Sequence, residues 1–218
     1  MKTRRTDDSR SERAIMEWLF ELLRDNVWSQ LEKVDTREEQ LAGIDLRLAS
    51  HIIDVKVQAG QGWVGSPATT QCLELSSISM RTQERVAGWF KNNELATTHY
   101  IIGLIHEVNE ITNPEGYVTD PASEIKRMEL IFIKKDVLKK YIHRYMNPEQ
   151  LEALENELLR TGKRKHVINP FLKMVCSHQL AEKPVNLCLD LGIYRELAEN
   201  IFLIEDGKIR AVSKYAVA

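Results

Sequence analysis

The chain has 218 residues, a formal net charge of -2 and a hydrophobic share of 43%. This length and composition suit one domain, or one domain with an appendage, with enough apolar side chains for a core. The small net charge excludes a strongly basic nucleic-acid coat but leaves room for a local basic patch.

The cysteines and the first residues indicate a cellular compartment. Cys72, Cys176 and Cys188 have neither the spacing of a metal site nor an even number for a disulfide framework. We therefore expect reduced thiols in a cytoplasmic protein. The first residues are polar and no apolar run is long enough for a bilayer, so we expect neither a signal peptide nor a membrane span.

The N-terminal part predicts a helix after a polar lead. Residues 1–10 are expected to be disordered. Ser11 is a plausible N-cap for a helix from Glu12 to Arg24, whose apolar residues recur at helical spacing. The acidic residues of this helix are Glu12, Glu17 and Glu21.

The stretch from Gln40 to Ala59 predicts a β-hairpin, because apolar residues alternate on both sides of Ala49-Ser50. A turn centred there pairs Leu48 with His51, Arg47 with Ile52, Leu46 with Ile53 and Asp45 with Asp54. One face is then apolar, and the other carries Asp45, Asp54, Lys56 and Gln58. Two like charges opposite each other are destabilising, so we expect a cation between them, either Lys56 or a divalent metal.

The next part of the chain predicts a loop, a strand, a helix and a central strand. The loop is 60–70, with Trp63 packed in the core or exposed for base stacking. A strand over Gln71–Ser79 would bring Glu74 to the carboxylates if it pairs beside Ile52–Gln58. Thr82–Asn92 follows as a helix, and Thr98–His106 is apolar enough for a central strand.

The rest of the chain predicts a long loop over Asn109–Glu124, a strand over Arg127–Lys134 and helices over Lys135–Tyr145 and Glu149–Arg160. The basic run from Arg160 to His166 is either a nucleic-acid contact or a solvated connector. The remainder mixes short strands and helices.

The hairpin carries a resemblance. Ile44-Asp45 followed by Asp54-Val55-Lys56 resembles the metal-binding motif of the PD-(D/E)xK nuclease superfamily, with Ile in place of the proline. Segments 73–76 (Leu-Glu-Leu-Ser) and 88–90 (Gly-Trp-Phe) are also similar to small phage and bacterial proteins of this group. The resemblance covers about residues 11–105.

Two other tripeptides, at 124–126 (Glu-Ile-Lys) and 206–208 (Asp-Gly-Lys), also fit the second half of this motif. The first follows a proline-containing loop and the second reads as a tight turn. Asp54-Val55-Lys56 differs from both, since it lies in an alternating strand with a facing Asp45. An ordinary charged strand face is the alternative.

The resemblance implies an α/β, restriction-endonuclease-like core with a mixed central sheet flanked by helices. We expect this core over residues 11–145, after the disordered lead 1–10, and a C-terminal extension, 146–218, packed on it. The implied function is Mg²⁺- or Mn²⁺-dependent hydrolysis of phosphodiester bonds in DNA or RNA. The alternative is an inactive nuclease fold that binds nucleic acid or protein.

The resemblance also implies roles for individual residues. Asp45 and Asp54 would hold the metal, Lys56 would act on the attacking water, and Gln58 would position water or phosphate. Glu17 is the expected ligand from the first helix, with Glu21 as the fallback, and Glu74 is a possible further ligand. The expected partner is nucleic acid, DNA above all, and a homodimer stays open.

Overall fold

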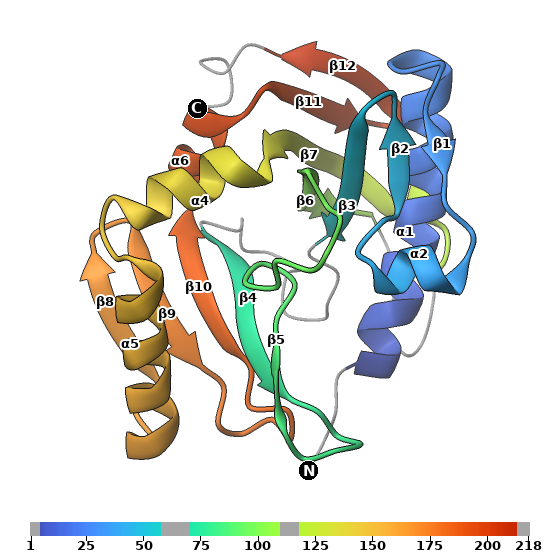
Figure 1. Ribbon diagram of the computed structural model, residues 1–218. Helices are drawn as coiled ribbons and strands as arrows, with labels where there is room; N and C mark the ends of the chain where they lie inside the picture. Colours follow the sequence, from blue (N-terminus) through green and yellow to red (C-terminus); the bar gives the residue numbers. More distant parts are fainter. Residues whose placement is uncertain (1–4, 58–69, 110–117, 213–218) are drawn as a thin grey trace. The chain divides into compact units, whose positions relative to one another are not determined.

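The computed structural model describes residues 5–57, 70–109 and 118–212, with side chains from residue 10 onward. These residues form two compact units of mixed α/β structure, each with its own sheet (Figure 1). The seven-stranded unit contains residues 5–57, 96–109, 118–135 and 195–212. The five-stranded unit contains residues 70–95 and 136–194.

The sheet of the seven-stranded unit is mixed. Only β3 and β6 run parallel, and every other neighbouring pair that the structure describes is antiparallel. The unit also holds α1 (Arg5–Asn26), α2 (Arg37–Leu41) and α3 (Pro121–Glu124). In sheet order the strands are β1 (Glu32–Lys33), β2 (Leu46–Leu48), β3 (His51–Val57), β6 (His99–Val108), β7 (Ile125–Lys134), β11 (Asn200–Glu205) and β12 (Lys208–Val212).

The main core of this unit lies between α1 and one face of the sheet. Ile15, Leu19 and Leu23 recur every four residues, which places them on one side of the helix, and all are buried. They share a core cluster with Ile53 and Val57 of β3. Because side chains alternate along a strand, residues 54 and 56 point to the opposite face of the sheet.

The central position of β6 confirms the prediction from its apolar sequence. Residues 100–105 are buried, as expected for a strand covered on both faces. The Met128 side chain of β7 fills the space above Gly103, where a Cβ atom would overlap its terminal methyl. β6 therefore holds β3 on one side and β7 on the other.

The sheet of the five-stranded unit is antiparallel at every described pairing. α4 (Lys135–His143) leads into this unit, α5 (Pro148–Thr161) belongs to it, and α6 (Leu191–Leu197) leads out of it. In sheet order the strands are β5 (Arg85–Ala87), β4 (Thr70–Ile78), β10 (Val185–Asp190), β9 (Leu172–Cys176) and β8 (Lys165–Asn169).

The ends of α5 lie close to the predicted ones because its capping residues are local signals. The Asn147 side chain accepts a hydrogen bond from the Gln150 backbone amide, and the Gln150 side chain accepts one from the Asn147 backbone amide. Pro148 occupies the first turn. Gly162 ends the helix with a φ of 70°, a left-handed conformation that favours glycine.

Two local predictions are wrong. Thr82–Asn92 is not a helix, because its chain turns back and pairs β5 with β4. Gly88 fits there since a Cβ atom would overlap the carbonyl of Glu74, so pairing with the sheet overrides local helix propensity. Residues 5–10 belong to α1, although they were expected to be disordered.

The two units do not follow the expected division at residue 145. Residues 70–95 group with 136–194, while 195–212 return to the sheet that contains the N-terminal hairpin. No helix among the described residues is long and apolar enough to cross a membrane.

Candidate functional site

The β2–β3 hairpin has the predicted register. Leu46 pairs with Ile53, Arg47 with Ile52 and Leu48 with His51. The ladder stops one residue short of the expected Asp45–Asp54 pair. The chain still stays beside β3, because the Asp45 amide donates to the Ile53 carbonyl at 2.9 Å.

The Asp45 side chain is anchored on β3. Its Oδ2 accepts a hydrogen bond from the Val55 amide at 2.8 Å. This bond takes the place of a backbone ladder contact and fixes the carboxylate next to the Asp54-Val55-Lys56 segment. The hairpin turn and the hydrogen bond from the Val55 amide therefore both position Asp45.

Asp54 is the most deeply buried member of the motif, with a side chain only 3% exposed. Its Oδ1 forms a 2.6 Å ion pair with Lys56 Nζ, whose side chain is 28% exposed. Its Oδ2 is also buried but has no hydrogen-bond partner among the described residues. A buried carboxylate oxygen without a donor is unfavourable, and a cation would satisfy it.

Burial and neighbouring charge shift the protonation of Asp54. The pKa of Asp54 is raised to about 7, with burial as the largest cause. Lys56 opposes this change, and the negative charge of Asp45 adds to it. The carboxyl group thus titrates near neutral pH in the absence of a bound cation.

The same charges act differently on Lys56. Burial lowers its pKa, but the two carboxylates outweigh that effect, so the pKa of Lys56 is raised. The raised pKa values of the two partners have different causes, because Lys56 faces two anions, whereas Asp54 faces one cation, one anion and little water. Lys56 therefore remains an ammonium group at neutral pH.

Two residues that the motif did not indicate also act on this group. Tyr100 of β6 lies directly opposite Asp54 in the parallel ladder. Burial and then the charge of Asp54 raise the pKa of Tyr100, so its phenol stays protonated. Glu12, exposed on α1, adds a negative charge that raises the pKa of Lys56. No spacing rule distinguishes Tyr100 from an ordinary core tyrosine, and Glu12 was one of three acids in the predicted helix.

The structure places Glu17 in an ion pair with Lys33, with Nζ–Oε2 at 2.8 Å. The apolar residues of α1 pack on the face that carries Ile53, and the α1 residue whose charge acts on Lys56 is Glu12, not Glu17. Glu21 is exposed on the same helix. The structure thus does not bring Glu17 to the carboxylate pair.

Glu74 lies in the five-stranded sheet. The expected pairing of its strand beside β3 is wrong, because β4 pairs with β5 and β10, whereas β3 pairs with β2 and β6. Glu74 Oε1 accepts a hydrogen bond from the Ser77 hydroxyl at 3.1 Å. The predicted role of Glu74 rested on that strand pairing.

The assembled group therefore consists of Asp45, Asp54 and Lys56. Gln58 and the loop with Trp63 lie outside the described residues. Within 10–57, 70–109 and 118–212, no three His, Cys, Asp or Glu side chains are grouped as metal ligands. Two carboxylates with one unsatisfied buried oxygen still match the oxygen ligands that Mg²⁺ takes, since Mg²⁺ keeps several waters.

The other two matches to the tripeptide have structural roles. The Glu124 carboxylate accepts hydrogen bonds from the amides of Thr119 and Asp120. Asp206 and Gly207 both have a positive φ in the turn between β11 and β12, as the Asp-Gly signal predicts. The tripeptides at 124–126 and 206–208 therefore do not belong to the group around Asp54.

Comparison with known proteins adds no relative. No protein-family model matches the chain, and neither does any curated protein or solved structure. The functional argument thus depends on the residues themselves and on the resemblance that their motif carries.

Proposed function

We propose that this chain is a metal-dependent nuclease of the PD-(D/E)xK kind, with a restriction-endonuclease-like core in its seven-stranded unit. The observation that carries the proposal is the buried Asp54, with one oxygen held by Lys56 and the other without a partner. An isolated charged strand face would leave its carboxylates in water. Here one carboxylate is withdrawn from water beside a second, Asp45, which favours cation binding.

In this proposal Asp45 and Asp54 hold Mg²⁺ or Mn²⁺ through their carboxylate oxygens, and Gln58 positions water or phosphate. When bound, such an ion polarises a phosphate and lowers the pKa of a bound water. Asp54 must lose its proton to serve as a ligand, so loading of the site depends on pH around neutrality.

Lys56 has an electrostatic role in the proposed reaction. Because its pKa is raised, Lys56 is a protonated donor and not a general base at neutral pH. Its ammonium group orients the attacking water or a phosphate oxygen and stabilises negative charge that develops on the phosphate. The Val55 amide, which donates to Asp45 Oδ2, supports this geometry, and Tyr100 lies opposite Asp54 in the ladder.

Cleavage assays test the proposal. The parent protein should cut DNA or RNA in Mg²⁺ or Mn²⁺ and stop when the metal is chelated. Asp54→Asn and Lys56→Ala should each reduce the rate by about a hundredfold or more, the range seen when one charge-stabilising group is removed.

The chain offers a matched control for both changes. Asp206→Asn and Lys208→Ala alter the same tripeptide pattern in an exposed turn, where Asn also tolerates a positive φ. Both controls should cut at the parental rate. Cleavage that persists in Asp54→Asn contradicts the assignment. Nucleic-acid binding without any cleavage supports the alternative, an inactive binding module.

A further inference from the structure

Two cysteines of the five-stranded unit face each other across neighbouring strands. Cys72 of β4 pairs directly with Cys188 of β10, and both thiols are free. Directly opposite residues of an antiparallel pair have Cα atoms about 4.5–5.5 Å apart, within the range that a disulfide spans. The backbone therefore holds this pair at a Cα separation that a disulfide can span.

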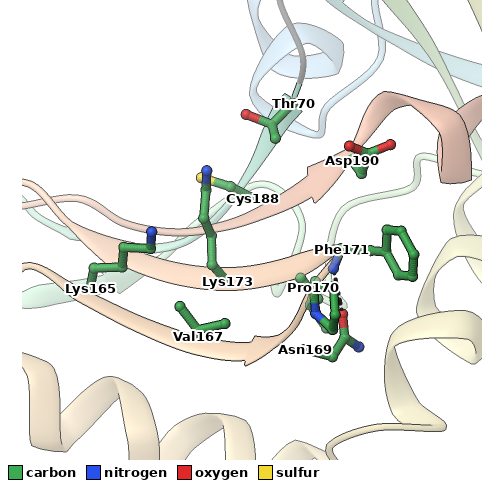
Figure 2. Close-up of a pocket in the computed structure, with 10 residues that line it drawn as sticks. Thr70, Lys165, Val167, Asn169, Pro170, Phe171, Lys173, Cys188 and Asp190 are labelled. Atoms are coloured by element: carbon green, nitrogen blue, oxygen red, sulfur yellow. Dashed lines mark hydrogen bonds between the residues drawn. The ribbon is translucent and has the colours of Figure 1, made fainter.

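Lys173 extends the same row by one strand. It lies on β9 directly opposite Cys188, so Lys173, Cys188 and Cys72 share one face of the sheet. Figure 2 shows the Lys173 ammonium group reaching toward Cys188. Both residues line a cavity of about 150 Å³, which also has Thr70 and Asp190 in its wall. The lining of this cavity does not include Cys72, so a peroxide reaches Cys72 through the partial exposure of that residue.

The two thiols differ in exposure and ionisation. A hydrogen bond from the Cys188 thiol lowers the pKa of Cys72, and the charge of Lys173 lowers it further against the effect of burial. The same hydrogen bond and burial raise the pKa of Cys188, which is only 5% exposed. Cys72 is the more exposed partner. An accessible thiolate is the reactive form of cysteine, so Cys72 is suited to react first.

We propose that Cys72 and Cys188 form a peroxide-sensitive dithiol, in which Cys72 is the reacting cysteine, Cys188 resolves the product and Lys173 activates the pair. This modification site lies in the five-stranded unit and is independent of the proposed nuclease site.

The oxidation runs in two balanced steps. The Cys72 thiolate attacks one oxygen of hydrogen peroxide, the O–O bond breaks, and the leaving hydroxide takes up a proton as water. The Cys188 sulfur then attacks the Cys72 sulfenic acid, and the hydroxyl leaves with the Cys188 proton as a second water. Two thiols lose two electrons to one peroxide, and a thiol reductant reverses the change.

Mass spectrometry of the full chain tests this inference. After stoichiometric hydrogen peroxide, the parent should lose two hydrogens and give one disulfide-linked peptide pair, Cys72 with Cys188. Dithiothreitol should restore the original mass. Cys188→Ser should instead accumulate a sulfenic acid at Cys72, trapped by dimedone, while Cys72→Ser should form no disulfide.

Cys176 is an internal control, because it is 1% exposed and burial raises its pKa, so it should stay reduced. Lys173→Gln should slow oxidation of Cys72 by roughly five- to tenfold at pH 7, since less of the thiol is ionised without the cation. Lys165→Gln removes an equal charge from the same cavity and should leave the rate within about twofold of the parent.

Two results would overturn the inference. One is a folded parent, by circular dichroism, that forms no disulfide under peroxide. The other is oxidation of Cys176 at the rate of Cys72, which would show general accessibility of the thiols and not a built pair. Equal rates in Lys173→Gln and the parent would remove Lys173 from the site.

Discussion

A carboxyl group that is costly to ionise lies at the centre of the candidate site. Asp54 is buried beside Asp45, and Lys56 only partly offsets the loss of water. Sites that bind cations often have this property, because the ion supplies the charge that the apo protein lacks. The Arg195–Glu129 pair shows the contrast, since the buried Glu129 carboxylate receives two guanidinium hydrogen bonds at 2.9 and 2.8 Å.

Asp54 should make the stability of the apo protein fall as pH rises. Its pKa is about 7 in the folded state and about 3.9 when unfolded, so between these values the folded state holds a proton that the unfolded state has lost. Stability from this group is present below about pH 4 and is lost by about pH 7. The shift of three units corresponds to about 4 kcal/mol.

Urea denaturation of the parent and Asp54→Asn at several pH values measures this effect. Relative to the parent, the variant should become more stable by several kcal/mol between pH 4 and pH 8. Asp35→Asn, which removes a carboxylate that is 76% exposed, controls for the chemical change. A constant difference between parent and Asp54→Asn across this range contradicts the raised pKa.

At the scale of elements, the hairpin shows what local sequence can predict. Its register follows from alternation of apolar residues on both sides of a short turn, and a slip of one residue would turn the apolar face of each strand outward. The ends of α5 were predictable for the same reason, since Asn147, Pro148 and Gly162 are local signals.

The position of Glu74 had no such local signal. β4 pairs with β10, which comes far later in the chain, and neither strand carries a mark that selects the other. Glu17 was a reasonable candidate by sequence, but Lys33 neutralises it. Long-range pairing and competition for ion partners thus explain most of the differences between the expected and observed site.

The turn of the hairpin permits a prediction for β2 and β3. Ala49 has a φ of 50°, a left-handed conformation that is strained for alanine and free for glycine. Ala49→Gly should therefore stabilise the protein by about 0.5–1 kcal/mol after the entropic cost of glycine. Chemical denaturation measures the change.

Ser50→Gly is the matched control in the same turn. Ser50 is not among the described residues with a positive φ, so glycine there gains no relief from strain. It should be neutral or destabilising. A loss of stability in Ala49→Gly, equal to that in Ser50→Gly, would contradict the strain argument.

At the scale of the molecule, the chain divides into two sheets that exchange segments. The seven-stranded unit holds the carboxylate pair and the five-stranded unit holds the cysteine pair. The chain thus carries two candidate chemistries on separate sheets, and each can be changed without altering residues of the other. Asp54→Asn should leave thiol oxidation unaffected, and Cys72→Ser should leave metal binding unaffected.

Thermal melts with and without metal test the central claim most directly. Saturating Mg²⁺, Mn²⁺ or non-catalytic Ca²⁺ should raise the melting temperature of the parent. At a hundredfold excess over the dissociation constant, the free energy of unfolding should increase by about 2.7 kcal/mol. Asp54→Asn should lose most of this gain and be at least as stable as the parent in chelator at pH 8. If the parent melts at the same temperature in saturating metal and in chelator, Asp45 and Asp54 are not a metal site.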